Sequence, residues 1–338
     1  MLAQSLAPTT RSGYQSAVSH LAKFMAKHNT PLTFPVAPDT ICLWMADSVK
    51  TLRFSSIRNY LHGIATTQKE LGFTEPLLNA PLIWRMFKGI KRIQGQQVVR
   101  KRLPITVKIL SQINHLFDTS KGDHLCMRAA MWLGTCGLLR SGEFTRKPSS
   151  YNSLKLQQLT FHDHNDTVLD PHRLNGVAPH YMTLRLEQSK TDVFRKGANV
   201  VIGNDRAIRY MLEYLQHRKP TLAKVPLFAG LDGQPLSTAT LVSFTQDFIK
   251  RAHIPNSHLF LGHSFRKGGA TSLHEAGHPD SLIKMMGRWA SFAFATYIDP
   301  PLTVLVRAGR SLQRVDNPTT ATLSSASHSS FWDVNDLH

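Results

Sequence analysis

Apolar residues recur at helical spacing through the first part of the chain. Tyr14, Val18, Leu21 and Met25 lie three or four residues apart, so they share one face of a helix. Three later groups have similar spacing: Ile41, Trp44 and Met45; Ile57, Tyr60, Leu61 and Ile64; and Ile83, Met86, Phe87 and Ile90. The pattern predicts a compact all-α module of four or five helices.

Local start signals set the expected boundaries of these helices. Pro8-Thr9-Thr10 indicates the beginning of the first helix, and Pro81 opens the fourth. Asp39 is predicted to cap the second helix and Ser55 or Ser56 the third, because these side chains accept backbone N–H bonds. Short turns that contain Pro or Gly are expected between the helices.

A second set of helical patterns begins at Thr106. The strongly apolar segment 125–139 follows and predicts a buried helix. Residues 205–217 and 237–253 also have helical patterns. This half of the chain is therefore expected to be mainly helical.

A short stretch of the same half has the two-residue period of β-strands. Residues 156–161 and 181–186 alternate apolar and polar side chains, and residues 199–202 form a third run of β-formers. The polar segment 162–179 is expected to be a loop. Lys190 is expected at the tip of a hairpin, where a lysine is usually just solvated. The sequence thus predicts a small antiparallel sheet within a mixed α+β domain.

A polar segment followed by a basic one separates the two halves. Residues 94–104 have few structure signals and contain the boundary residue Pro104, so they are predicted to be a linker. The expected organisation is one helical domain over residues 1–93 and a second domain over residues 105–314. Residues 315–338, rich in Ser and Thr, are expected to form a flexible tail.

The charge balance narrows the class of partner. The 338 residues include 40 Lys and Arg against 22 Asp and Glu, a formal net charge of +18. This surplus favours nucleic acid over an acidic membrane. The 3 cysteines form no C-x-x-C pair, which indicates a reducing compartment, and neither a signal peptide nor a membrane span is visible. We expect an intracellular protein without membrane contact, nuclear if the source is eukaryotic.

Basic residues gather around the predicted linker. No acidic residue occurs from residue 76 to residue 117. A solvated helix face is the ordinary explanation of a charge run, but so long a stretch without counter-charge favours contact with DNA phosphates. The predicted DNA-binding residues are Arg85, Lys88, Lys91, Arg92, Arg100, Lys101 and Arg102.

Two arginines are candidates for binding one small anion. His263 and Arg266 lie three residues apart and can converge on an anionic group from one helix face. Arg140 follows a buried apolar helix, where an unpaired charge is costly, although an arginine there can also reach the surface. Glu143, three residues later, can orient the Arg140 guanidinium. Tyr297, downstream of both, is a candidate nucleophile.

His274-Glu275-Ala276-Gly277-His278 matches the H-E-x-x-H pattern of zinc metalloproteases. That site needs both histidines on one continuous helical turn. Gly277 and Pro279 are helix-stop signals, so His278 is expected beyond the helix end. We therefore expect no metal site, and a metalloprotease is a remote alternative.

Five features occur in order along the chain: Arg140 in Gly137-Leu138-Leu139-Arg140-Ser141-Gly142-Glu143, Lys190 on a hairpin, His263-x-x-Arg266, Gly287-Arg288-Trp289, and Tyr297. This order resembles the tyrosine recombinases, also called the phage-integrase family, over residues 8–313. The resemblance implies that the helical module and basic linker form that family's core-binding domain, and that the second domain is catalytic. Gly287-Arg288-Trp289 and the block from His263 to Ala270 are most similar to recombinases of eukaryotic mobile elements, such as Cryptons and DIRS-type retrotransposons.

The resemblance implies a chemistry for each residue. Tyr297 would attack a DNA phosphodiester and form a 3′-phosphotyrosine, while Arg140 and Arg266 would bind the phosphate oxygens. Lys190 would protonate the leaving 5′-oxygen, and His263 would assist proton transfer. The covalent link conserves bond energy, so no metal or nucleotide cofactor is implied. The implied partner is double-stranded DNA, bound by a homotetramer on paired sites during integration or excision of a mobile element.

One position departs from the family pattern. Many members carry a histidine nine residues before the tyrosine. Arg288 has that spacing here and Trp289 lies one residue nearer, so either can support the phosphate.

Two other functions share much of this evidence. A catalytically silent DNA-binding protein would keep the fold, although it would not need every candidate catalytic residue. A type IB topoisomerase uses the same chemistry but relaxes supercoils without a defined site. A covalent protein–DNA adduct that depends on Tyr297 separates a strand transferase from a silent binder.

Overall fold

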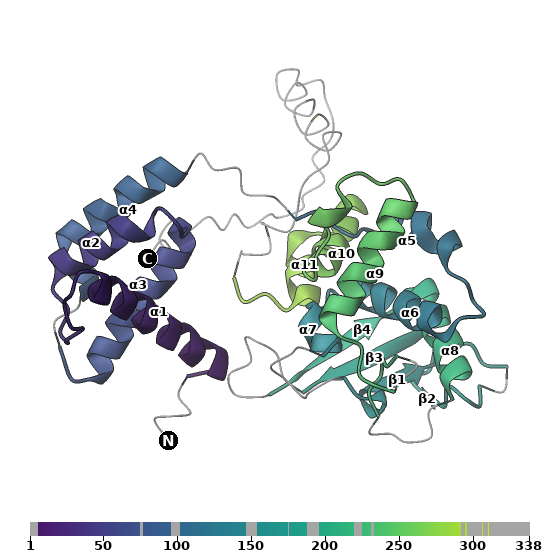
Figure 1. The fold of residues 1–338 in the computed structure, drawn as a ribbon. Coiled ribbons are helices and arrows are strands. Elements are labelled where there is room, and N and C mark those ends of the chain that lie inside the picture. The colour runs from purple at the N-terminus through teal and green to yellow at the C-terminus, as the bar shows by residue number, and fades with distance from the viewer. Residues whose placement is uncertain are drawn as a thin grey trace, which may run out of the picture. The chain divides into compact units, whose positions relative to one another are not determined.

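The computed structural model describes residues 6–74, 77–95, 102–146, 154–174, 176–187, 196–219, 225–230 and 233–291, with residues 295, 306 and 310. The chain divides into two compact units, Met1–Val99 and Arg100–His338, and each has its own hydrophobic core. Figure 1 shows the elements of both units. Among the described helices, none offers the long uncharged apolar run that a membrane crossing requires.

Four α-helices make up the described part of the first unit. They are α1 (Pro8–Lys27), α2 (Pro38–Ser48), α3 (Phe54–Glu70) and α4 (Pro81–Gln94), with a 3₁₀ turn η2 (Leu77–Asn79) before α4. Their apolar faces share one core, in which Leu21, Trp44, Leu61 and Ile83 are fully buried. The apolar periodicity predicted this module correctly, because each short helix is stabilised by burying one apolar stripe.

The starts of these helices differ from the predicted caps. Prolines occupy the first turns of α1, α2 and α4, where a missing N–H costs nothing. Asp39 lies inside the first turn of α2, where its charge faces the positive end of the helix dipole. Ser55 and Ser56 lie inside α3, which begins at Phe54. The capping predictions for α2 and α3 are therefore wrong.

The last residue of α4 ties this helix to the turn between α2 and α3. The Gln94 side chain accepts a hydrogen bond from the Phe54 N–H at 2.6 Å. It also donates to the carbonyls of Val49 and Leu52 at 3.1 and 2.9 Å. The polarity of Gln94 indicated a linker residue, but its amide satisfies three backbone groups that would otherwise lack partners. Gln94 therefore belongs to the helical unit.

The second unit is mainly helical around a buried central helix. Its described helices are α5 (Val107–Ile113), α6 (Gly122–Cys136), α7 (Ser141–Phe144), α8 (Asp205–Arg218), α9 (Thr238–Arg251), α10 (Ser264–Glu275) and α11 (Asp280–Gly287), with 3₁₀ turns η3 (Asn114–Leu116), η4 (Leu156–Gln158) and η5 (Ser257–Leu259). Every residue from Leu125 to Thr135 of α6 is buried. Helix α6 packs against α8 and α10, so it connects most of the unit.

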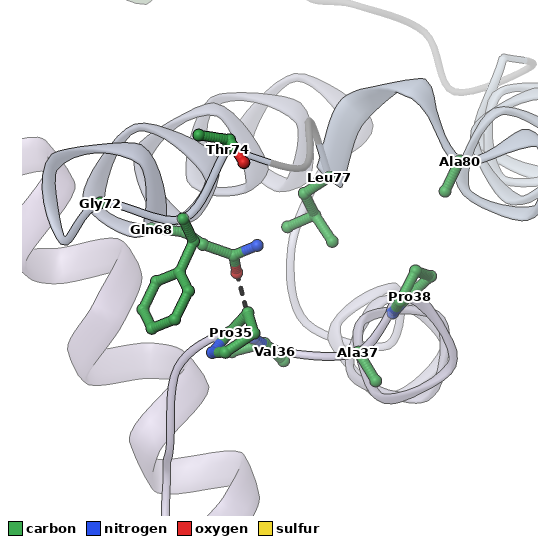
Figure 2. A pocket seen from close by; sticks show the side chains of 10 residues that line it. Pro35, Val36, Ala37, Pro38, Gln68, Gly72, Thr74, Leu77 and Ala80 are labelled. Carbon is green, nitrogen blue, oxygen red and sulfur yellow. Dashed lines mark hydrogen bonds between the residues drawn. The ribbon is translucent and has the colours of Figure 1, made fainter.

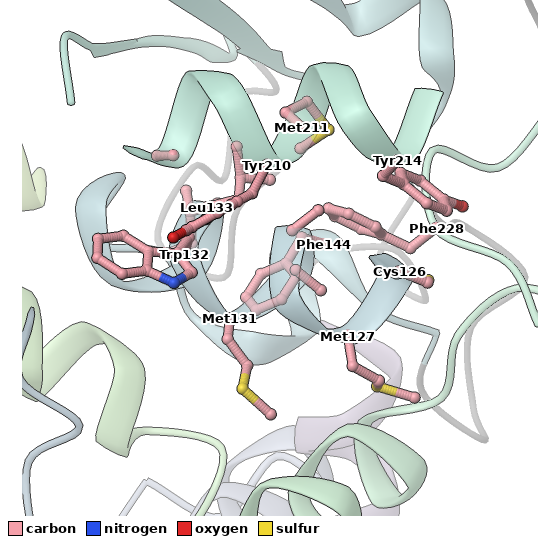
Figure 3. Close-up of a cluster of buried hydrophobic side chains, with 14 of the residues drawn as sticks. Cys126, Met127, Met131, Trp132, Leu133, Phe144, Tyr210, Met211, Tyr214 and Phe228 are labelled. Atoms are coloured by element: carbon pink, nitrogen blue, oxygen red, sulfur yellow. The ribbon is translucent and has the colours of Figure 1, made fainter. Parts of the chain in front are cut away.

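Aromatic pairs fix the helices around α6 (Figure 3). Trp132 of α6 meets Tyr210 of α8 edge to face, with ring centroids 5.5 Å apart. Phe144 of α7 meets Phe228 in the same way at 6.2 Å. A Cβ at position 134 would lie 2.7 Å from the Phe144 ring, so Gly134 lets α7 approach α6 closely. This packing positions the helix that directly follows Arg140.

An antiparallel sheet completes the second unit. Its strands are β1 (Leu159–His162), β2 (Val168–Leu169), β3 (Tyr181–Leu186) and β4 (Ala198–Ile202), in the order β2-β1-β3-β4. Burial alternates along β3, as its sequence pattern predicted. Strand β2 lies in the segment expected to be a loop, because two residues are too few to show an alternation. Residues 156–158 form η4 rather than the start of a strand. With the all-α first unit, this architecture confirms the predicted fold class.

Helix α6 ends at Cys136 rather than at Leu139. The Leu139 N–H then bonds to the Gly134 carbonyl at 2.9 Å and the Leu138 N–H to the Thr135 carbonyl at 3.2 Å. This Schellman arrangement places Leu138 in the left-handed region, with a φ of 47°. Glycine usually occupies that position, so a leucine there costs about 1–2 kcal/mol, which the surrounding packing must offset.

The chain enters the second unit along helix α10. The Ile105 N–H bonds to the Ser264 carbonyl at 2.9 Å, and the Lys267 ammonium donates to the Arg102 carbonyl at 3.1 Å. A Cβ at position 268 would come within 1.8 Å of the Ile105 carbonyl oxygen, so this backbone contact requires Gly268. Residues 102–105, predicted largely as linker, are thus bound to the helix that carries Arg266.

Candidate active site

Arg140 precedes the short helix α7 and is held by Glu143. One carboxylate oxygen of Glu143 accepts from the Arg140 backbone N–H and the other from the Arg140 guanidinium, both at 2.9 Å. The carboxylate therefore caps the helix and orients the guanidinium together. Among the described residues, only Glu143 accepts a hydrogen bond from this guanidinium. The Arg140 side chain remains 19% exposed, so it is oriented on one side and reachable on the other.

Arg266 is fully buried in the same region. Its guanidinium donates to the Leu138 carbonyl at 2.8 Å and to the Gly287 carbonyl. The Trp289 ring lies against it, with the guanidinium carbon 4.2 Å from the ring centroid. Carbonyl dipoles and an aromatic face stabilise a cation that has been removed from water. Arg266 thereby joins the C-terminal end of α6 to that of α11.

Arg288 turns inward and joins this cluster. Its guanidinium donates to the Glu143 carboxylate at 3.0 Å and to the carbonyls of Gly137 and Leu138, each at 3.3 Å. Burial lowers the pKa of the Arg288 guanidinium, the Glu143 carboxylate opposes that effect, and the Arg140 charge adds to it. Glu143 therefore lies between two guanidinium groups, those of Arg140 and Arg288.

The sequence Gly287-Arg288-Trp289 shapes the end of α11. Arg288 has a left-handed φ of 56°, and the Trp289 N–H closes the helix on the Lys284 carbonyl at 3.1 Å. The Trp289 ring folds back over Gly287, where a Cβ would lie 1.6 Å from a ring carbon. Glycine is thus required before this turn, which directs the tryptophan to Arg266 and the arginine toward α6.

His263 is the residue before α10 and is exposed, whereas Arg266 in the first turn of that helix is buried. The two residues were expected to converge on one anion from a single helix face. Their side chains instead lie at different depths, His263 at the surface and Arg266 in the interior. The N-terminal end of α10 also presents the positive end of its dipole, which favours an anion.

Tyr297, Lys190, Arg100 and Lys101 lie outside the described residues. Lys190 belongs to the connection between the paired strands β3 and β4, and Tyr297 follows α11 in the sequence. Their assigned roles stay predictions.

The remaining residues predicted to bind DNA are exposed. Arg85, Lys88, Lys91 and Arg92 lie on α4 of the first unit, and Arg102 lies at the start of the described part of the second. The stretch that contains them has no acidic residue. Exposed cations without counter-charge suit phosphate contacts.

An exposed tryptophan, not singled out in the sequence, lies beside these basic residues. Trp84 is 56% exposed and lines a groove of about 380 Å³ between α3 and α4. Lys88 and Lys91 of α4 and Arg58 and His62 of α3 line the same groove. Cations beside an apolar aromatic surface suit DNA, which offers phosphates together with base edges and methyl groups.

A second hollow of the first unit, about 700 Å³, lacks basic side chains among the described residues that line it (Figure 2). It lies between residues 35–38 and the end of α3, and none of the described residues that line it is charged. Its Gln68 side chain accepts a hydrogen bond from the Val36 N–H at 3.0 Å. We assign no anion site there.

Helix α10 ends inside the H-E-x-x-H sequence. Its last residue is Glu275, and Gly277 adopts a left-handed φ of 85°. The His278 N–H bonds back to the Leu273 carbonyl at 3.1 Å, which closes the helix. The predicted helix stop is confirmed, and the two histidines do not share the continuous helix that a metalloprotease needs.

No protein-family model matches this sequence. Over 283 residues the chain is 23% identical to an integrase/recombinase XerD homolog from Selenomonas ruminantium, a match that covers 80% of this chain and 75% of the relative. A solved XerH site-specific recombinase, in a post-cleavage complex with its difH substrate, has a TM-score of 0.59 at 15% identity and covers 90% of this chain and 80% of its own.

Two further solved structures share the architecture. A Tn1549 transposon integrase in complex with transposon right end DNA has a TM-score of 0.56 at 12% identity, covering 93% of this chain and 95% of its own. A lambda integrase dimer bound to a core site has a TM-score of 0.51 at 17% identity, and the match covers 87% of this chain and 73% of the integrase. The fold is that of the tyrosine recombinases. This chain is thus similar in sequence to an integrase/recombinase and in fold to solved recombinases and integrases.

Within this recombinase fold, sequence reasoning missed two contacts of the cluster. The Leu138 carbonyl accepts from both Arg266 and Arg288. The Glu143 carboxylate binds Arg288 as well as Arg140. The first depends on a left-handed leucine that no propensity predicts, and the second joins two segments distant in the sequence. The position of Arg288, nine residues before Tyr297, was the one local signal in the sequence that this arginine belongs to the site.

Proposed function

We propose that this protein is a DNA strand transferase that cleaves and rejoins DNA through a 3′-phosphotyrosine at Tyr297. The observation that carries the proposal is the arginine cluster. Arg140 and Arg266 come from distant segments yet are connected through Glu143, Arg288 and the Leu138 carbonyl. Two guanidinium groups in one site suit the two non-bridging oxygens of a phosphodiester.

In the proposed step, the Tyr297 hydroxyl oxygen attacks phosphorus and the bond from phosphorus to the 5′-oxygen breaks. The tyrosine proton passes to His263 or water, and Lys190 protonates the leaving oxygen, so a 5′-hydroxyl is released. Arg140 and Arg266 stabilise the charge that grows on the phosphate oxygens. One phosphate ester replaces another, so attack by the 5′-hydroxyl of a second strand rejoins DNA without an external energy source.

The exposed basic residues of α4 support double-stranded DNA as the partner. The XerH, Tn1549 and lambda proteins were each solved bound to DNA. We propose a homotetramer on two paired sites, with one protomer for each strand that is cleaved. Light scattering of the DNA complex checks this stoichiometry, and complexes that never exceed two protomers would contradict it.

We also propose a role in moving a DNA element. The Gly287-Arg288-Trp289 turn and the block from His263 to Ala270 resemble recombinases of Crypton and DIRS-type elements. A reporter plasmid that carries the DNA flanking the gene should lose the flanked segment when the protein is expressed. Retention of that segment under conditions where strand cleavage proceeds would contradict this role.

Covalent capture tests the strand-transfer chemistry. Duplexes that the wild-type protein binds are selected from a random-sequence library and nicked near their centres, so that cleavage releases a short fragment and traps the protein. A denaturation-resistant adduct is expected with the wild type and with Tyr181→Phe, a control on β3, but not with Tyr297→Phe.

The other outcomes of this capture point to the alternative functions. Tight binding without an adduct on any selected duplex would favour a silent DNA-binding protein. Relaxation of a supercoiled plasmid without site preference would favour a type IB topoisomerase.

A further inference from the structure

Glu143 is shared by two guanidinium groups. Its Oε1 accepts from the Arg140 guanidinium at 2.9 Å, and its Oε2 accepts from the Arg288 guanidinium at 3.0 Å. Oε2 also accepts the Arg140 backbone N–H at 2.9 Å. The Glu143 side chain is only 4% exposed, so water does little to balance its charge. How strongly it holds Arg140 therefore depends on the second arginine.

The Arg288 guanidinium is also held by backbone carbonyls at the C-terminal end of α6. The Gly137 and Leu138 carbonyls accept its N–H groups at 3.3 Å, and they lie at the negative end of that helix dipole. Leu138 and Arg288 both have left-handed backbones, with φ of 47° and 56°. Neither conformation is the local preference of its residue type, so tertiary contacts hold both turns in place.

We propose that Arg288 is a positioning residue that directs Arg140 by way of Glu143 and does not itself bind the DNA phosphate. This inference rests on the proposed function, in which Arg140 binds that phosphate. The role of the family's histidine is then divided between two side chains. Arg288 balances and orients Glu143, and Trp289 supports the phosphate side through its contact with Arg266.

The bonds of Arg288 argue against direct phosphate contact. One terminal nitrogen of its guanidinium donates to the Glu143 carboxylate, which neutralises the charge that a phosphate would need, whereas the described acceptors of Arg266 are backbone carbonyls. Rotation toward DNA would take a charged donor from Glu143 and another from the Gly137 carbonyl, which is costly because the Glu143 carboxylate is nearly buried.

A double-mutant cycle between Arg288 and Glu143 tests the inference. Arg288→Met removes the charge and the donors but keeps much of the side-chain length, and Glu143→Gln removes the carboxylate charge with little change of shape. Single-turnover cleavage should slow about tenfold to a hundredfold in Arg288→Met, but less than about threefold when the same change is made in Glu143→Gln. The Kd for the same duplex should change less than about twofold, because affinity comes mainly from phosphate contacts elsewhere.

Direct phosphate contact predicts a different result. Arg288→Met would then slow cleavage by the same factor in both backgrounds and would weaken DNA binding, and that additive outcome overturns the inference. Arg288→Lys should recover part of the lost rate, since it still balances Glu143. If Arg288→Met does not fold by thermal melting, Arg288→Gln carries the same cycle, because it removes the charge and can still donate one bond.

A second measurement is independent of cleavage. The Arg140 side-chain Nε–H signal in an NMR spectrum, assigned by its loss in Arg140→Lys, should shift in Arg288→Met without DNA. An unchanged signal overturns the inference whatever the protein does to DNA. Absence of any adduct with the wild type contradicts the proposed function instead, so the two failures are distinguishable.

Discussion

The two units hold positive charge in opposite ways. On α4, Arg85, Lys88 and Lys91 are exposed, in a stretch of sequence without a carboxylate. In the second unit, Arg266 and Arg288 are buried or nearly so, and each is held by backbone carbonyls at helix ends.

The difference separates affinity from chemistry. Mobile exposed cations gather a polyanion and release its counterions without a fixed geometry, so they contribute affinity that salt weakens. An arginine held in place, such as Arg140 by Glu143, loses little freedom when a phosphate arrives, so it can stabilise charge that appears only in the transition state. We therefore expect changes on α4 to alter binding and changes in the cluster to alter rate.

Loss of Arg140 should have the largest effect. Arg140→Ala is expected to slow single-turnover cleavage about 10²- to 10³-fold, the usual cost of one transition-state donor, with less than threefold change in Kd. Arg173→Ala, an exposed arginine of the same unit, is the control and should leave the rate unchanged. A large loss of affinity at an unchanged cleavage rate would show that Arg140 supplies DNA affinity, as proposed for α4, rather than catalysis.

Removing two lysines from α4 should act on binding alone. Lys88→Ala with Lys91→Ala should weaken DNA binding about tenfold per lysine at ~0.1 M salt and lower the salt slope of log K by about 2. Cleavage at saturating DNA should not change. Lys50→Ala, a lysine paired with Asp47, should keep the wild-type slope in a fluorescence anisotropy titration. Equal slopes in both variants would exclude phosphate contact by α4.

Exchanging arginine and lysine tests whether each unit depends on the geometry of the cation or on its charge alone. Arg140→Lys keeps the charge but loses the planar fork that Glu143 orients, so cleavage should fall about tenfold or more. Lys88→Arg should change affinity by less than about twofold, because a solvated phosphate contact needs charge rather than geometry. Both are measured on one duplex, and tolerance of lysine at position 140 would show that geometry is not what Arg140 supplies.

Trp84 should have the smallest effect. Trp84→Ala is expected to weaken DNA binding about threefold, on the scale of one buried methyl group, without changing the salt slope. Leu71→Ala, an exposed apolar residue that does not line the groove, is the matched control. An altered slope would mean that Trp84 acts by arranging Lys88 and Lys91 rather than by touching DNA.

Apolar periodicity predicted the helices well, because burial of one stripe per helix dominates their stability. The errors occur where hydrogen bonds of backbone groups, rather than apolar burial, determine the local structure. Leu138 was assigned to the α6 helix because it is apolar, yet it reverses the chain in a left-handed conformation. Gln94 indicated a linker because it is polar, yet it caps backbone groups of an earlier turn. Neither outcome depends on the hydrophobicity of the residue.

The candidate site divides in the same way. The Arg140 and Glu143 contact was visible in the sequence because residues three apart meet on a helical turn. Arg288 competed with Trp289 because spacing alone shows neither a partner nor a direction. Its partners, Glu143 and the Gly137 and Leu138 carbonyls, lie far away in the sequence. Only the folded chain brings them together.

The contact between residues 102–105 and α10 determines where a fragment that contains the second unit must begin. A fragment that begins at Val107 lacks Ile105, which is fully buried, and the carbonyl that accepts the Lys267 bond. It would uncover the helix that carries Arg266. A transferable second unit must therefore begin at or before Arg102. Gene fusions and domain exchanges that join the chain after that point should yield proteins that expose α10 and resist proteolysis poorly.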